Sequence, residues 1–413
     1  MNDVEILISG AGPAGTATSL FLSKMEIPHT IIDKASFPRD KICGDALSGK
    51  VVHVLNKIDT QIIKEFSVNT TEFTGSYGMC FFAPNGKKLE VPFSMKPGML
   101  KNAPGFISRR INFDNFLFNR LDRNFANVEE KTELIDVVKE ENGIIAHLKN
   151  ANGNYQKKFK LIVGADGDRS IVSKKLDPLK KNLSNYCAAL RAYYTGVKGS
   201  HQNNFIELHF MKDLLPGYFW VFPMNDGSAN IGIGMLSEVV ARKKINLRKK
   251  MENIIATHPS VRNRFEDAKL EGDIHGWGLP LGSARRSLAG DNFILTGDAG
   301  SLIDPFTGEG IGNALYSGML AAETISEAIT ENKFDKKFLS GYEKKLYYNL
   351  NKELNLSRGI QKLAHHAWLF NFVVNKARKN SMLRETMTCM FDDIDIRARL
   401  RKPSFYYKLL FNK

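Results

Sequence analysis

Short apolar runs that end at glycine recur along the first 330 residues of the chain. The first lies in VEILISGAGPAG, where it enters a glycine turn that is followed by helical spacing over residues 14–25. A second apolar run, residues 29–32, ends at Asp33. A strand, a turn, a helix and a second strand in this order predict a βαβ unit near the N-terminus.

The pattern changes between residues 71 and 100, where short alternating runs flank the turn Asn85-Gly86, as is typical of an antiparallel hairpin. Strand-like sequence returns over residues 186–235, and helical spacing covers 111–125 and 246–258. The buried-strand runs at 160–164 and 292–296 each lead into a glycine-rich turn. The sequence therefore predicts an α/β domain interleaved with an antiparallel sheet domain and followed by a helical C-terminal extension.

Composition narrows the class of protein. The chain has 413 residues, 43% hydrophobic and 25% charged, as in ordinary globular proteins. Four scattered cysteines without metal-ligand spacing, an N-terminus unlike a secretory signal and no apolar run long enough to span a bilayer predict a cytoplasmic location and no metal site.

The positive charge is concentrated at one end. Residues 331–413 hold 18 Lys or Arg against 8 Asp or Glu, and so carry +10 of the formal net charge of +14. This region, with KPSFYYKLLFNK at its end, indicates either a solvated helical surface or peripheral attraction to an anionic membrane. No nucleic-acid-binding module is readable from its spacing, so we expect no nucleic-acid partner.

The segment Gly10-Ala11-Gly12-Pro13-Ala14-Gly15 fits the pattern G-x-G-x-x-G between a strand and a helix. Glycine at the first position permits a tight turn, at the second a close approach of pyrophosphate, and at the third close packing of helix on strand. The helix N-terminus presents N–H groups to the phosphates, and Asp33 at the end of the next strand can accept hydrogen bonds from a ribose. A dinucleotide site is predicted.

Two further glycine-containing segments follow, Ala165-Asp166-Gly167 and GDAGSLIDPFTGEGIGNAL at residues 297–315. We call these two segments and the Gly10–Gly15 turn the three stations. The three stations in this order resemble the FAD-dependent oxidoreductases that include aromatic hydroxylases, flavin-dependent halogenases and geranylgeranyl reductases. The resemblance implies that Asp298 binds the ribityl chain of the flavin and that residues 308–313 pass its pyrimidine end. It also implies a phosphate contact for Arg110 and a backbone contact to adenine at Leu134.

Two segments resemble the geranylgeranyl-reductase branch. FPRDKICGD (37–45) is similar to its R-x-K-x-C-G segment, which would place Cys43 beside the flavin as a catalytic candidate. Residues 218–223 are similar to its Y-x-W-x-F-P signature, with Tyr218, Trp220 and Phe222 on one face as either substrate wall or core. Pro216 stands one residue closer to the tyrosine than in that branch, and GYFWVFP is also similar to a halogenase segment. Ser301 stands where hydroxylases usually carry histidine.

The motif and the resemblance together give a set of cofactor-binding residues: Gly10, Gly12, Ala14, Gly15, Asp33, Lys34, Cys43, Gly44, Ala46, Arg110, Leu134, Asp166, Asp298, Gly308, Gly310, Ile311, Gly312 and Asn313. The implied domain order is a FAD-binding domain at 1–70, 106–180 and 277–330, a substrate domain at 71–105 and 181–276, and a basic helical region at 331–413.

The predicted function is reduction of C=C bonds in a hydrophobic, isoprenoid-type substrate by hydride from FAD. Because the chain has no second G-x-G-x-x-G, NAD(P)H or another reductant is expected to donate electrons transiently. A monooxygenase or halogenase is the alternative within the enzymes, and a basic nucleic-acid-binding protein the alternative outside them.

Overall fold

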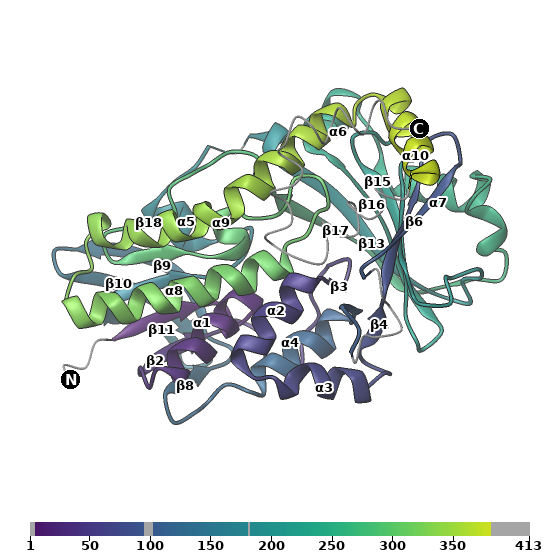
Figure 1. The fold of residues 1–413 in the computed structure, drawn as a ribbon. Coiled ribbons are helices and arrows are strands. Elements are labelled where there is room, and N and C mark those ends of the chain that lie inside the picture. The colour runs from purple at the N-terminus through teal and green to yellow at the C-terminus, as the bar shows by residue number, and fades with distance from the viewer. Residues whose placement is uncertain (1–4, 95–101, 181, 381–413) are drawn as a thin grey trace. The chain divides into compact units, whose positions relative to one another are not determined.

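The chain folds into two compact units, each assembled from separate stretches of sequence (Figure 1). The computed structural model describes residues 5–94, 102–180 and 182–380. The first unit comprises Met1–Lys41, Arg110–Asn185 and Leu279–Ser357, and the second comprises Ile42–Arg109, Tyr186–Gly278 and Arg358–Lys413. Residues 42–70, which we predicted as part of the FAD-binding domain, fall in the second compact unit.

The first unit is built on a six-stranded sheet in the order β18-β19-β12-β1-β2-β8. Neighbouring strands are parallel except for the pair β18–β19. The central strands ILIS and LIVG are buried along their whole length, as the interior of a parallel sheet requires. The strands are β1 (Ile6–Ser9), β2 (His29–Ile32), β8 (Ala126–Glu129), β12 (Leu161–Gly164), β18 (Ala289–Gly290) and β19 (Phe293–Leu295).

Helices of this unit pack on the sheet and on one another. α1 and α8 lie side by side (Figure 1) because Gly318 has no side chain: a Cβ there would lie 2.4 Å from the carbonyl oxygen of Ala14. A three-stranded antiparallel sheet, β11-β10-β9, completes the unit. The elements are α1 (Pro13–Lys24), α4 (Arg110–Phe118), β9 (Glu133–Glu140), β10 (Gly143–Asn150), β11 (Gly153–Phe159), α5 (Ile171–Leu176), a 3-10 turn η4 (Gly297–Gly300), α8 (Ile311–Glu331) and most of α9 (Lys336–Leu363).

The second unit is built on a seven-stranded sheet in the order β17-β13-β16-β15-β14-β5-β6. The predicted hairpin at Asn85-Gly86 is confirmed as β5–β6. The sheet is not wholly antiparallel, because β5 and β14 run parallel. Its strands are β5 (Gly78–Phe82), β6 (Lys88–Pro92), β13 (Tyr186–Thr195), β14 (Ile206–His209), β15 (Tyr218–Pro223), β16 (Ser228–Leu236) and β17 (Lys269–Pro280).

The same unit holds a small sheet, β3-β7-β4, and, among its described residues, five whole α-helices, the 3-10 turn η3 (Arg262–Arg264) and the end of α9. The small sheet consists of β3 (Ala46–Leu47), β4 (Thr74–Ser76) and β7 (Gly105–Ile107). The helices are α2 (Gly49–Ile58), α3 (Gln61–Val68), α6 (Ser237–Arg242), α7 (Leu247–Thr257) and α10 (Ala367–Lys379). None of the helices in the described ranges combines the length and apolar character needed to cross a bilayer. The predicted interleaved α/β fold with C-terminal helices is confirmed.

Candidate functional site

The glycine turn joins β1 to α1. Gly10 has φ +99°, and a Cβ there would lie 2.6 Å from the carbonyl oxygen of Ala165, while a Cβ at Gly15 would lie 1.8 Å from the carbonyl oxygen of Gly10. Gly12 is different, because the nearest atom to its Cβ position is Nη2 of Arg39 at 3.6 Å. No side chain caps the N-terminus of α1 at Gly12. The turn therefore presents a helix N-terminus and an arginine toward the same space, an arrangement that suits a phosphate.

Asp33 closes this turn from the end of β2. Its carboxylate accepts the N–H groups of Ala11 at 3.0 Å and Ala35 at 2.9 Å. Nη2 of Arg39 lies 3.7 Å from the same carboxylate. Thr132, next to the start of β9, donates its N–H to the carbonyl of Asp33, which brings the strand containing Leu134 beside the turn. Lys34 is exposed, and Ala14 is buried under the turn.

Arg110 is 3% exposed and forms a double hydrogen bond with Asp114, at 2.6 and 2.7 Å. Asp114 also accepts Nη1 of Arg39 at 2.7 Å. Burial alone would raise the pKa of Asp114, but the two arginines outweigh it and hold that pKa below its usual value. The arginine that lies against the Gly12 turn is thus Arg39, which our sequence reasoning missed although it stands in the quoted segment FPRDKICGD. The cofactor contact of Arg110 stays a prediction.

Asp166 follows β12 and caps the short helix α5. Its Oδ2 accepts the N–H groups of Ile171 at 2.7 Å and Val172 at 3.4 Å, whereas its buried Oδ1 has no hydrogen-bond partner. Burial raises the pKa of this carboxyl, and its hydrogen bonds offset only part of that rise. An unpaired buried oxygen is costly unless a ligand supplies a donor.

The turn that contains Asp298 is contacted by Lys41, a second residue that the sequence analysis missed. Asp298 lies in η4, after Gly297 with φ +54°, and Nζ of Lys41 is 3.3 Å from its Oδ2. The same Nζ lies 4.0 Å from the Cβ position of Gly167. The stations at Asp166 and Asp298 are therefore neighbours around one ammonium group within the first unit.

The loop before α8 is stiffened by its own side chains. Asp304, 2% exposed, accepts the N–H groups of Phe306 and Thr307, and Asn313 donates to the carbonyl of Leu302 at 2.7 Å. Gly310 is the N-cap of α8 and its Cβ position lies 3.8 Å from Oδ1 of Asp298. Residues 308–312 thus place the start of α8 beside the Asp298 turn. The N–H of Gly312, a predicted cofactor-binding residue, is already donated to the carboxylate of Glu309 at 2.8 Å.

In the second unit, residues 43–45 of the first branch-like segment touch the aromatic strand, residues 218–223. A Cβ at Gly44 would lie 3.2 Å from the ring of Phe222 and 3.8 Å from Nε1 of Trp220. Asn230 on β16 accepts Nε1–H of Trp220 at 2.8 Å and donates to the carbonyl of Cys43 at 2.9 Å and to Asp45 at 2.8 Å. Asp45 also accepts the hydroxyl of Tyr193 at 2.6 Å. Asn230 therefore ties the Cys43–Asp45 turn to the aromatic strand, and sequence reasoning missed it.

The aromatic strand has the predicted facing. The rings of Tyr218 and Trp220, and those of Trp220 and Phe222, are 6.2 Å apart. Trp220 and Phe222 are each 7% exposed, and the indole lies over Gly232. Ala46 continues the turn into β3, where it pairs with Ile107. The two interpretations of this face, substrate wall and core, stay predictions.

Three of the four thiols lie in described parts of the chain, and they differ. Burial raises the pKa of the Cys80 and Cys187 thiols to about 12, which leaves both as unreactive thiols. Cys43 is half-buried, as is the residue Cys187, although the thiol group of Cys187 is enclosed. Cys389 lies outside the described residues. No group of three potential metal-ligating His, Cys, Asp or Glu side chains occurs in the ranges that the structure describes.

The donor set of the first unit fits FAD. A cradle that a Cβ at Gly12 would fill, an uncapped helix N-terminus, the Arg39 guanidinium, and two carboxylate turns around Lys41 match a dinucleotide with a polar ribityl chain. The unpaired Oδ1 of Asp166 fits a ligand that donates a hydrogen bond. The fold and the site together define a flavin-dinucleotide-binding protein.

Comparison with known proteins identifies the family. A family model described as FAD binding domain matches residues 3–345. The digeranylgeranylglycerophospholipid reductase of Methanococcus vannielii is 30% identical over 373 residues, 87% of each chain. The menaquinone reductase of Mycolicibacterium smegmatis is 29% identical over 78% of this chain and 76% of its own. The chain belongs to the FAD-binding oxidoreductase family and to its geranylgeranyl-reductase-like branch, and FAD is its cofactor.

A solved structure shows the same fold. The geranylgeranyl bacteriochlorophyll reductase-like protein of Thermoplasma acidophilum superposes with a TM-score of 0.80 at 22% identity, over 96% of this chain and 98% of that one. At this identity, the similarity concerns the fold alone.

Proposed function

We propose that the enzyme reduces C=C bonds of an unsaturated isoprenoid lipid. The observation that carries this proposal is the contact between the Cys43–Gly44 turn and the Trp220–Phe222 strand, since these are the two segments that resemble the reductase branch. The names of the relatives support the substrate class, because digeranylgeranylglycerophospholipid and menaquinone both carry isoprenoid chains.

We infer specific roles for the site residues. Gly12, the N-terminus of α1 and Arg39 bind the pyrophosphate, and Asp33 binds the adenosine ribose. Asp166, Asp298 and the start of α8 hold the flavin half. When bound, FAD supplies a hydride to one alkene carbon, and the other carbon takes a proton from water or an acid. NAD(P)H or another reductant restores the electrons.

The test separates reduction from oxygenation. Flavin bound to the enzyme is reduced without oxygen and then mixed with a geranylgeranyl lipid, and in a parallel sample with oxygen and halide. We expect reoxidation by the lipid and a product two hydrogens heavier. Incorporation of oxygen or halide into an aromatic or alkene substrate would establish the monooxygenase or halogenase function instead.

We also propose that the protein is cytoplasmic and associates peripherally with anionic membranes, through α10. Trp368 is 67% exposed and Phe372 38% exposed, one turn apart on this helix, and Lys376 follows one turn later. The opposite side is packed, since Phe370 stacks on Phe210 at 4.4 Å. Residues 354–384 contain no Asp or Glu. An aromatic and basic stripe of this kind suits an anionic lipid surface. The terminal KPSFYYKLLFNK segment lies outside the described residues.

Vesicle sedimentation tests this association. We expect the protein to sediment with vesicles containing phosphatidylglycerol and not with neutral ones, and the double variant W368S/F372S to remain in the supernatant. Val68, 84% exposed on α3, supplies the control V68S, which should sediment like the parent protein. Equal recovery of the parent protein in both supernatants would contradict the proposal, and tight salt-sensitive binding to DNA would favour the nucleic-acid alternative.

A further inference from the structure

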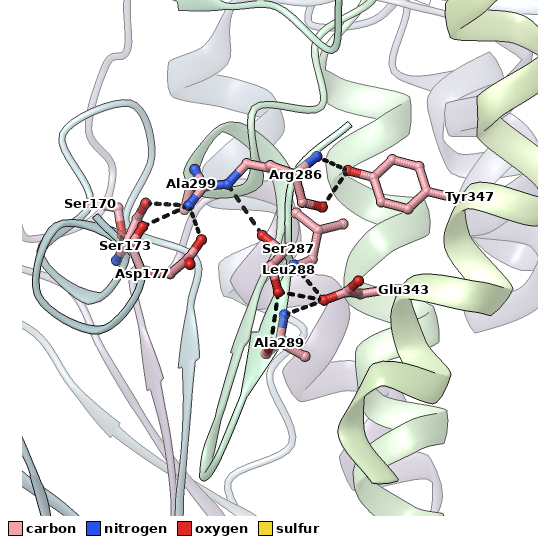
Figure 2. Close-up of polar contacts among 10 residues, drawn as sticks. All are labelled: Ser170, Ser173, Asp177, Arg286, Ser287, Leu288, Ala289, Ala299, Glu343 and Tyr347. Carbon is pink, nitrogen blue, oxygen red and sulfur yellow. Dashed lines mark hydrogen bonds and ion pairs between the residues drawn. The ribbon is translucent and has the colours of Figure 1, made fainter. Parts of the chain in front are cut away.

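Arg286, in the segment between β17 and β18, lies inside the first unit with a side chain 7% exposed. Figure 2 shows its guanidinium between two parts of the chain. Nη2 donates to the Asp177 carboxylate at 2.6 Å and to the Ser173 hydroxyl at 3.1 Å, while Nη1 donates to the carbonyl of Ala299 at 3.3 Å. A single planar cation therefore joins two segments that are far apart in sequence.

The first of these segments is α5, which connects Arg286 to Asp166. Asp166 accepts the first two N–H groups of this six-residue helix, and Arg286 binds Ser173 in its middle and the C-cap residue Asp177 at its end. A helix of six residues spans only about 9 Å at 1.5 Å per residue, so its two ends move together as one rigid segment. The position of Arg286 is thus transmitted to the Asp166 turn.

The second segment is the turn that contains Asp298. Ala299 is the next residue in η4, and its carbonyl is the acceptor of Nη1. Two contacts with α9 fix the backbone around Arg286: the hydroxyl of Tyr347 bonds its N–H and carbonyl, and the carboxylate of Glu343 accepts from Ser287, Leu288 and Ala289 (Figure 2). The Glu343 contacts hold the strand β18, whereas the guanidinium of Arg286 holds the two turns.

We propose that Arg286 is a positioning residue that sets the spacing of the Asp166 and Asp298 turns so that both carboxylates contact one FAD. This inference rests on the FAD contacts proposed for Asp166 and Asp298. A lysine cannot replace the arginine, because one ammonium does not reproduce the planar fork that reaches Asp177 and Ala299 together.

The experiment measures the FAD dissociation constant of the apoprotein, the visible circular dichroism of the bound flavin and the melting temperature of the apoprotein. The variants are R286Q and R286K, with E343A as the matched control in the same network. We expect both arginine variants to raise the dissociation constant by about tenfold or more, the effect of one lost charge-assisted hydrogen bond. Their flavin spectrum should change, while E343A lowers the melting temperature and leaves affinity and spectrum unaltered.

Equal changes in FAD affinity for R286Q and E343A, once matched for loss of melting temperature, would reduce Arg286 to a structural role and overturn the proposal. If the arginine variants do not fold, the double variant S173A/D177A removes both side-chain acceptors that α5 and its C-cap offer to Arg286 while keeping Arg286 itself. An unaltered dissociation constant in S173A/D177A would overturn the proposal too. The variant D298A tests the assumption that Asp298 contacts FAD independently of Arg286. Unchanged FAD affinity in D298A would contradict the proposed cofactor contacts themselves.

Discussion

Three carboxylates of the predicted motifs, Asp33 and Asp166 in the first unit and Asp45 in the second, are held by different kinds of donor. In the first unit, Asp33 and Asp166 accept backbone N–H groups from residues no more than 22 positions away. In the second unit, Asp45 is held by the side chains of Tyr193 and Asn230, which are 148 and 185 positions away. Asp33 and Asp166 therefore take their places with their own turns, whereas Asp45 takes its place only when β13 and β16 are assembled. Substitutions in the two units should fail in different ways.

The largest expected effect is at the glycine turn. Valine at Gly12 should abolish FAD binding, because its side chain would occupy the space that the pyrophosphate needs, while the backbone (φ −76°, ψ −174°) accepts a β-branched residue. The purified variant should be colourless but folded, with stability changed by no more than about 1 kcal/mol. Bound FAD and circular dichroism measure the two outcomes.

The matched variant is G15V, where the new Cβ would lie 1.8 Å from a backbone oxygen. This variant should lose the fold itself. A yellow G12V protein that releases FAD on denaturation, or a stable G15V protein, would contradict our account of the turn.

The next effect tests the side-chain network of the second unit. N230A removes the acceptor of Trp220 and the donor to Cys43 and Asp45 from a fully buried position. We expect a loss of about 3 kcal/mol in the free energy of unfolding, since buried partners are left unsatisfied. Backbone amides of residues 43–46 should also exchange hydrogen faster.

Asn225 provides the control for N230A, because it makes several hydrogen bonds on the exposed side of the same unit. N225A should cost no more than about 1 kcal/mol and leave exchange at 43–46 unaltered. Equal effects of the two variants would show that Asn230 does not hold the Cys43–Asp45 turn.

This difference also explains what the sequence could predict. The three glycine-containing turns, the βαβ unit and the hairpin at Asn85-Gly86 depend on residues that are adjacent in sequence. The local sequence pattern was therefore enough to predict them. Arg39 bonds Asp114 across 75 positions, and Arg286 bonds Asp177 across 109. Such contacts depend on the tertiary arrangement, and a single sequence has no signal that pairs them. Lys41 was part of the quoted segment FPRDKICGD, but nothing in the sequence indicated that its side chain would lie beside Asp298.

A smaller effect comes from pH. Burial raises the pKa of Asp166, so the folded state binds more protons than the unfolded state between the ordinary and the raised value. Stability contributed by this group is therefore lost as pH rises through that window. D166N should stabilise the apoprotein by about 1 kcal/mol at pH 7, because the neutral amide avoids the cost of burying an ionised carboxylate.

The contribution of Asp114 to stability changes with pH in the opposite direction. Its paired arginines lower its pKa, so its contribution is present above the ordinary carboxyl pKa and lost as pH falls through the lowered value. Urea unfolding of the parent apoprotein, D166N and D114N at pH 4 and pH 7 measures both. The advantage of D166N should shrink at pH 4, and D114N should be less stable than the parent at pH 7. An advantage of D166N that is equal at both pH values would contradict the burial argument.

The smallest expected effect on stability is that of C43A. The hydrogen bond from Asn230 goes to the backbone carbonyl of Cys43, so alanine retains it, and the thiol is only half-buried. We expect a change below about 1 kcal/mol in the free energy of unfolding. Because the fold is retained, any change in the reaction reports on the thiol itself. If Cys43 acts at the flavin, reoxidation of the reduced enzyme by a geranylgeranyl lipid should slow in C43A, with reoxidation by a small artificial acceptor as the control. Unaltered rates with the lipid would assign Cys43 to packing, and the Trp220 strand would then carry the substrate proposal alone.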